Sequence, residues 1–335
     1  MSVNKKIFKI KKKLNRHKVY DCFMFSNELE LLNFRLEYLS PYVDFFVLVE
    51  SRKTTQGNPK PLFYNDNKSK FKKHIHKIKH LIVDDFPTGA VPHTIETIQR
   101  NEMISSLVDC NVHDLILISD LDEIPNLNKM PKKLYDGVVY HFIQDQLIYF
   151  ANIYKEKHII WEGGTKVVTY KTIRDNLLDE AFVHYGPTFL SEYNEGSTLT
   201  KVRLYRKTNF IYNSGYHLTY FGGTNRIIQK MKTFSHPELI QSGRYTKEFI
   251  RHNLSNGNDI FDTNQKIYRL PDSEFLKLLR KFLSKDFFYE SCKTQNKFAY
   301  QFRRIFEIVL ISLRSLLRVR YLFLRSIIRK LWKKF

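Results

Sequence analysis

The stretch LILISDLDEIP, residues 115–125, joins an apolar run to an acidic cluster. Residues 115–118 are aliphatic and bounded by charge, which is typical of a strand buried on both faces of a parallel sheet. Three carboxylates follow directly, at Asp120, Asp122 and Glu123. Because ligands bind at the carboxyl ends of parallel strands, this stretch predicts both a fold class and the place of a site.

The sequence around this stretch alternates β-rich runs with helical patterns. These repeated units predict an α/β fold with a doubly wound, Rossmann-type, mostly parallel sheet flanked by helices. Beyond residue 135 the pattern is weaker and the strands are mixed. Strands are expected at 19–25, 43–50, 81–83, 115–118, 137–142, 146–151 and 166–170, and helices at 27–39, at 94–109 with Thr94 as N-cap, and after 225.

The composition is that of a globular chain. The 335 residues are 43% hydrophobic and include 27 Phe and 20 Tyr, which supply enough rigid apolar surface for a large core. Cys22, Cys110 and Cys292 lie far apart. This spacing excludes a disulfide framework and a CxxC metal site, and it indicates a reducing compartment.

The net charge of +21 is concentrated at the two ends of the chain. Residues 1–18 hold eight basic residues and no acidic one, and residues 302–335 hold ten basic residues and one acidic residue. Residues 19–301 therefore carry only +4. A nearly balanced body argues against an extended nucleic-acid track, so we expect no nucleic-acid partner.

Neither end has the pattern of a secretory signal or of a membrane-spanning helix. Behind the basic arm of residues 1–18, the apolar run at 19–25 is short and is interrupted by Asp21. In the tail, residues 301–335, arginines interrupt every window of the roughly 20 apolar residues that a span requires. We therefore expect a single catalytic domain over residues 19–300 in a cytoplasmic protein.

The tail has its own helical pattern. Arg314, Arg318, Arg325 and Arg329 fall on one side of a helix, and aliphatic residues cover much of the rest. This distribution predicts an amphipathic helix that lies on an anionic membrane and makes the protein peripherally membrane-associated. The alternative is a helix that packs on the core with its arginines in solvent.

The acidic cluster predicts a metal site. Neighbouring carboxylates repel one another, so a cation usually neutralises them. Mg²⁺ and Mn²⁺ favour oxygen ligands and commonly bind through one or two carboxylates plus substrate phosphates. Asp120 and Asp122, at the end of a buried strand, therefore indicate a site for a metal ion and a nucleotide.

Seven motifs follow one another along the chain: YDCFMFSNELELL at 20–32, FVLVE at 46–50, NPKPL at 58–62, Arg100-Asn101, SDLDEIP at 119–125, GYHLTYFGG at 215–223 and SHPE at 235–238. Together they resemble glycosyltransferase family 17. The resemblance covers about residues 19–265 and leaves both basic tails unexplained. It implies a GT-A-like fold and transfer of N-acetylglucosamine from UDP-GlcNAc, with a divalent metal and inversion at the anomeric carbon. The acceptor would be a glycan or a lipid-linked glycan.

Residues for binding the donor can be proposed on this basis. Asp120 and Asp122 would hold the metal, and His217 is a candidate for a further ligand or a phosphate contact, a histidine packed among tyrosines being the alternative. Glu28 and Glu50 follow the first two strands and could receive the uridine or the ribose. Arg100 and Lys166 could pair with the diphosphate.

The catalytic base is less well defined. Inversion in one displacement requires a group that takes the proton of the acceptor hydroxyl. Glu123, Asp145, Glu195 and Asp259 are candidates. We favour Asp259 because the family resemblance continues there, although a turn-capping role is an alternative.

Two other classes of function remain open at the level of sequence. A metal-dependent nucleotidyltransferase would use the same paired carboxylates to activate a hydroxyl for attack on a phosphate. A non-catalytic protein that binds membranes or nucleic acid is supported by the tails alone.

Overall fold

The computed structural model describes residues 17–157, 159–183, 199–233 and 238–332. Its centre is a seven-stranded sheet in the order β11-β6-β10-β4-β1-β2-β3. Neighbours from β4 through β1 and β2 to β3 are parallel, as are β6 and β11, whereas β10 runs antiparallel to β4 and β6. The strands are β1 (Val19–Met24), β2 (Phe45–Glu50), β3 (Ile78–Ile82), β4 (Leu115–Asp120), β6 (Val139–Phe142), β10 (Lys166–Thr169) and β11 (Thr208–Ile211).

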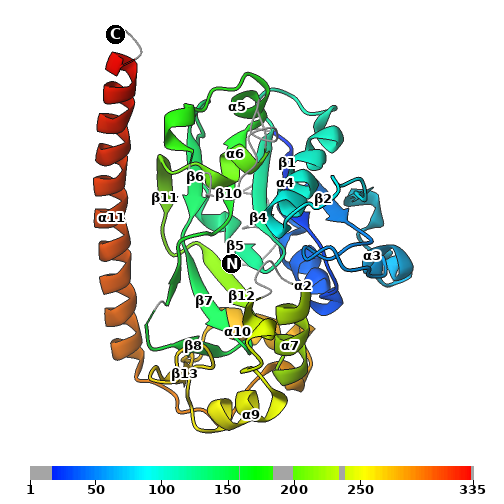
Figure 1. Ribbon diagram of the computed structural model, residues 1–335, viewed down its shortest axis with the longest axis vertical. Helices are drawn as coiled ribbons and strands as arrows, with labels where there is room; N and C mark the ends of the chain where they lie inside the picture. Colours follow the sequence, from blue (N-terminus) through cyan, green and yellow to red (C-terminus); the bar gives the residue numbers. More distant parts are fainter. Residues whose placement is uncertain (1–16, 158, 184–198, 234–237, 333–335) are drawn as a thin grey trace.

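Helices cover both faces of this sheet because its inner strands are apolar on both sides. Alternate residues of β4 enter different cores: Leu115 and Leu117 pack with α2 (Leu29–Leu39), whereas Ile116 and Ile118 pack with residues from α6 (Leu199–Leu204). The helix α4 (Pro92–Glu102) lies on the same side as α6 (Figure 1). The expected α/β class, with a large, mostly parallel sheet flanked by helices, is therefore confirmed.

A second, four-stranded sheet lies beside the first, in the order β5-β12-β7-β9. Its strands are β5 (Glu123–Pro125), β7 (Gln144–Ile148), β9 (Ile160–Trp161) and β12 (Gly215–Thr219), and β8 (Ile153–Lys155) pairs separately with β13 (Ile267–Arg269). Since β5 follows β4 after two residues, the second sheet begins directly at the acidic cluster.

The remaining helices are mostly short. Near the second sheet lie α7 (Thr224–Thr233), α9 (Lys247–Ser255) and α10 (Glu274–Phe282), at the bottom of Figure 1. The others are α3 (Phe63–Asp66), α5 (Tyr170–Arg174) and α8 (Glu238–Gln241), with 3₁₀ turns at Lys68–Phe71, Ile75–Lys77, Met103–Leu107, Leu127–Lys129, Glu180–Phe182 and Lys285–Phe287.

One long helix, α11 (Lys297–Trp332), ends the described chain. It stands along one side of the body beside β11, and its C-terminal end extends past the body (Figure 1). Most of the basic tail, residues 301–335, lies in this helix. In the part of the chain that the structure describes, no helix is long and apolar enough to cross a membrane.

The predicted helix at 94–109 differs from the structure at both ends. It begins at Pro92, with Val91 as N-cap, so Thr94 lies inside the first turn. Proline suits the first helical position because its missing N–H would have no partner there. After Glu102 the backbone continues as the 3₁₀ turn Met103–Leu107. The basic arm falls largely outside the described residues.

Candidate functional site

A cleft opens at the carboxyl ends of β1 and β4, where the sequence predicts a site. The cleft comprises about 1410 Å³, part of it open to solvent, which is ample for a nucleotide sugar. Of the predicted residues, Glu28, Asp120, Asp122 and His217 line it. The parallel register brings Met24 of β1 opposite Asp120 of β4, so the β1 loop that carries Glu28 faces the acidic cluster.

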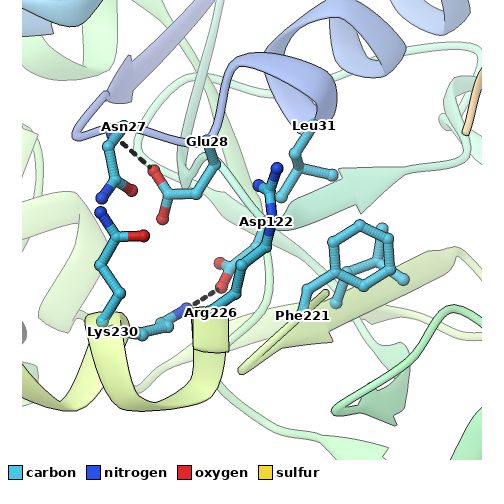
Figure 2. A pocket seen from close by; sticks show the side chains of 9 residues that line it. Asn27, Glu28, Leu31, Asp122, Phe221, Arg226 and Lys230 are labelled. Carbon is cyan, nitrogen blue, oxygen red and sulfur yellow. Dashed lines mark hydrogen bonds and ion pairs between the residues drawn. The ribbon is translucent and has the colours of Figure 1, made fainter. Parts of the chain in front are cut away.

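Asp122 lies between His217 and Lys230. The antiparallel pairing of β12 with β5 places His217 opposite Glu123, and its Nε2 atom is 3.4 Å from Oδ1 of Asp122. Lys230 on α7 donates to Oδ2 of Asp122 at 2.6 Å, on the edge of a smaller hollow beside the cleft (Figure 2). Burial raises the pKa of Asp122, but Lys230 and His217 outweigh burial and hold this pKa well below its usual range.

Asp120 lies between two arginines. Nη2 of Arg203 donates to one of its oxygens and Nη2 of Arg100 to the other, each at 3.1 Å. Burial raises the pKa of Asp120, and the two guanidinium groups more than offset this effect, so the pKa is lowered. Arg100 thus lies behind a carboxylate of the cleft and does not itself line it.

Glu123 is fully buried and does not line the cleft. Its oxygens accept hydrogen bonds from Arg203 at 2.6 and 2.9 Å and from the indole nitrogen of Trp161 at 2.7 Å. Burial raises the pKa of Glu123 in spite of Arg203. This carboxylate therefore holds the cleft wall in place, which differs from its expected role as a catalytic base.

Trp161 and His217 form a stacked pair at the cleft. Their ring centroids are 4.4 Å apart and the ring planes are inclined by 27°. Both residues line the cleft, and Trp161 is only partly buried. Because Glu123 fixes the indole nitrogen and Asp122 contacts the imidazole, the two rings have defined orientations.

The backbone of the acidic loop is held by a single buried arginine. Arg35 of α2 is fully buried and forms a two-pronged ion pair with Asp21 of β1, at 2.6 and 2.8 Å. Its Nη1 atom also donates to the carbonyls of Asp120, Leu121 and Glu123, at 3.1, 3.0 and 2.7 Å. Arg35 therefore fixes the conformation that directs Asp120 and Asp122 into the cleft.

The cleft wall carries lysines as well as carboxylates. Lys53, Lys60, Lys155 and Lys230 line it together with Glu28, Glu96, Asp120 and Asp122. Burial lowers the pKa of Lys60, although Glu50 and Glu28 oppose the change. Lys230 is paired with Asp122 and Lys155 lies 3.6 Å from Asp259, so Lys53 and Lys60 are the lysines that could pair with a negatively charged ligand.

Two predicted donor-binding residues lie away from the cleft. Glu50 is fully buried and accepts hydrogen bonds from the backbone N–H groups of Tyr64 and Asn65, at 2.8 and 3.2 Å, at the start of α3. Lys166 is also buried and donates to the carbonyls of Arg203 and Tyr205. Burial, reinforced by two nearby arginines, holds the pKa of Lys166 well below its usual range.

Asp259 lies behind the cleft wall. It is fully buried, accepts a hydrogen bond from the hydroxyl of Tyr149, and lies 3.6 Å from Nζ of Lys155. Since Lys155 lines the cleft and Asp259 does not, this carboxylate positions a cleft lysine and has no direct access to an acceptor.

The remaining base candidates also differ from the expectation. Asp145 is bound by Arg304 at 2.7 and 2.8 Å and lines a separate cavity at the base of α11. Glu195 lies outside the described residues, as do three residues of the motif at 235–238.

A divalent metal fits the two aspartates only in combination with other ligands. Both line the cleft, and their pKa values are lowered, which favours the ionised oxygens that Mg²⁺ and Mn²⁺ prefer. Among the described residues, however, no group of three His, Cys, Asp or Glu side chains could hold a metal. An ion here would therefore share its coordination shell with ligand phosphates and water.

A comparison with known protein families finds a match for the N-terminal part of the chain, which carries several residues of this site. Residues 2–149 match the model of glycosyltransferase family 17. This match confirms the expected resemblance to that family over these residues. It includes Glu28, Asp120 and Asp122 and ends before the sequences of Trp161, β12 and α7. The name of the family indicates a glycosyltransferase.

The curated relatives carry one name. Beta-1,4-mannosyl-glycoprotein 4-beta-N-acetylglucosaminyltransferases of Rattus norvegicus, Homo sapiens and Mus musculus are each 30% identical to this chain over 129 residues. The alignment covers 36% of this chain and 24% of each relative. The chain therefore spans about a quarter of the length of these proteins.

Proposed function

We propose that the protein is an inverting, metal-dependent glycosyltransferase of the GT-A type, which transfers N-acetylglucosamine from UDP-GlcNAc to a hydroxyl of a glycan. The observation that carries the proposal is the meeting of Asp120 and Asp122 with four lysines in one cleft at the strand ends. The two aspartates lie in the segment that matches the family, and the relatives are named for N-acetylglucosamine transfer.

The charges of the cleft support binding of a diphosphate. Lys53 and Lys60 offer positive charge. Asp120 and Asp122 are already paired with Arg100, Arg203 and Lys230, so a metal ion between them and a diphosphate would share these carboxylates with the basic side chains. We propose that Asp120 and Asp122 hold Mn²⁺ or Mg²⁺ together with the donor phosphates, with His217 beside them. Such an ion supplies positive charge to the departing diphosphate without any proton transfer.

The base in this proposal is Glu28. Glu123 and Asp259 are buried away from the cleft, and Asp120 and Asp122 are paired with cations. Glu28 lines the cleft, and its carboxylate accepts a hydrogen bond from the backbone N–H of Asn27 at 3.0 Å. Among the described residues it forms no ion pair, so it can accept the proton of an acceptor hydroxyl.

We propose that the acceptor sugar binds beside the ring of Trp161, which lines the cleft. An indole presents a flat apolar surface with its N–H at one edge, and here the N–H is already bound by Glu123. The exposed part of the ring can therefore receive the apolar face of a sugar. We further propose that the enzyme works in peripheral association with a membrane, where a lipid-linked glycan would be the acceptor.

The test is to incubate the full chain with a panel of UDP- and GDP-sugars, with Mn²⁺ or with EDTA, and to identify the products. We expect release of UDP from UDP-GlcNAc in Mn²⁺ and loss of that release in EDTA. The donor anomeric configuration should be inverted in the product. Release of pyrophosphate from a nucleoside triphosphate would instead indicate a nucleotidyltransferase and overturn the proposal.

A further inference from the structure

The helix α11 exposes a continuous row of large apolar side chains. Nine of them have exposed fractions between 50% and 85%. We call this row the outer face of α11. It consists of Phe298, Phe302, Ile305, Phe306, Val309, Leu313, Leu316, Leu317 and Tyr321.

The spacing of these residues places them on one side of the helix. Successive members are three or four positions apart, apart from two adjacent pairs, so they follow the 3.6-residue period over about six turns. The opposite side packs on the body, where Ile311 is buried against Ile143 and Ile160. The outer face is therefore turned away from the core.

Polar contacts also fix which side of α11 meets the body. Arg304 binds Asp145, and Nη2 of Arg303 is 3.3 Å from Glu156. The carboxylate of Glu307 accepts a hydrogen bond from the backbone N–H of Ile160 at 3.0 Å. The sequence alone predicts that the basic residues of the tail face lipid or solvent, but Arg303, Arg304 and Arg314 pair with acidic residues of the body.

An exposed row of this extent is unusual on a soluble protein. Single apolar side chains on a surface are normal, whereas large contiguous apolar patches mark sites of interaction with proteins or membranes. The charges beside the row indicate the kind of partner. Glu307 is the only acidic residue in residues 302–335, and it is turned to the body, whereas Arg320 is exposed on the side of the row. Arg314 and Arg318 are also exposed, but they line a hollow against the body, where Arg314 lies 4.0 Å from Glu162.

We propose that the outer face of α11 lies on an anionic lipid surface, with its apolar side chains below the headgroups and Arg320 among them. Arg320 favours lipid over a second copy of the chain. It lies on the same side of the helix as Phe302 and Leu313, 18 and 7 positions away. Between two protein copies this charge would be buried among apolar side chains, whereas in a membrane its long stem lets the guanidinium reach the phosphates.

The experiment compares vesicle co-sedimentation of the full chain with that of the triple variant Phe302→Gln/Leu316→Gln/Leu317→Gln. The wild-type protein should sediment with vesicles that contain phosphatidylglycerol and less with vesicles of phosphatidylcholine alone. This preference should weaken as salt shortens the Debye length from about 10 Å at 0.1 M to about 3 Å at 1 M. In the variant, three large apolar side chains are no longer transferred from water into the membrane. Its affinity for the vesicles should therefore be lower by a factor of at least about ten.

A matched control changes three exposed apolar residues elsewhere, as Ile75→Gln/Val108→Gln/Tyr135→Gln. These side chains are 49%, 83% and 56% exposed, so both triple variants should keep the wild-type melting temperature, and the control should bind vesicles like wild type. Donor hydrolysis is measured separately and does not enter the result. Equal binding by wild type and the α11 variant would overturn the proposal. So would a wild-type protein that binds no vesicles and instead forms a dimer that the α11 variant abolishes.

Discussion

At the scale of single residues, the two aspartates of the cleft are each paired with two basic side chains, and both should be needed for transfer. Asp120→Asn and Asp122→Asn each remove a charge with little change in volume. We expect each to lower transfer by at least about a hundredfold, the cost of losing one electrostatic contact in a transition state. Both variants should also lower the melting temperature, because Arg100 and Arg203 lose a charged partner in one, and Lys230 and His217 lose theirs in the other. Near-wild-type turnover of both variants in saturating Mn²⁺ would contradict the metal assignment.

A variant of His217 can show whether this residue binds the donor or only packs in the cleft wall. Its ring is largely buried, stacked on Trp161 and in contact with Asp122. We expect His217→Ala to lower stability by about 1 to 3 kcal/mol, since the stack is lost. If the imidazole also contacts the metal or the diphosphate, the KM for the donor should rise and the response to Mn²⁺ should weaken. Urea unfolding without ligands measures the loss of stability, and steady-state kinetics measures the KM for the donor and the response to Mn²⁺. An unchanged KM would show that His217 has a packing role only.

At the scale of elements, Arg35 joins α2, β1 and the acidic loop after β4. Arg35→Met leaves the carboxylate of Asp21 buried without its partner, which should cost about 3 to 5 kcal/mol. Arg52→Met is a matched control, because Arg52 pairs with Asp84 at the surface, where such pairs contribute at most about 1 kcal/mol. Adding Asp21→Leu to Arg35→Met should recover part of the stability but not the activity, because three loop carbonyls still lack their donor. Recovery of both would show that Arg35 serves only to neutralise Asp21.

The strand β4 and the acidic cluster at its end show how much of the site can be predicted from the sequence. The run at residues 115–118 is apolar at every position, so its burial and the acidic strand end beyond it follow from local pattern alone. Lys230 is 108 residues away from Asp122, and Trp161 is 38 away from Glu123. No local pattern marks these partners, because Trp161 reaches Glu123 only through the second sheet, in the order β5-β12-β7-β9, and Lys230 reaches Asp122 only through the packing of α7. Buried carboxylates such as Glu50 and Asp259 were likewise indistinguishable in sequence from carboxylates of the cleft.

At the scale of the whole molecule, the buried positive charges at one end of the central sheet should make folding sensitive to mild acid. His141 of β6 is buried, and its ring contacts that of Phe210. Three positive charges act on it, from Lys166, Arg203 and Arg206. Burial, and then these three positive charges, hold the pKa of His141 well below its usual value of 6.5. The folded protein therefore keeps this imidazole neutral at a pH where the unfolded chain binds a proton.

The sign of the effect follows from proton linkage. Above pH 6.5 His141 is neutral in both the folded and the unfolded chain, so its titration does not change the free energy of unfolding. Below pH 6.5 only the unfolded chain binds a proton at His141, and the free energy of unfolding falls by up to about 1.4 kcal/mol per pH unit. His141→Leu removes the titrating group, so the loss of stability between pH 7.5 and roughly pH 5.5 should become smaller than in wild type. His252→Gln, at an exposed histidine, should leave the wild-type decline unchanged. Urea unfolding at the two pH values measures the difference, and an equal decline in wild type and His141→Leu would assign the acid sensitivity to other groups.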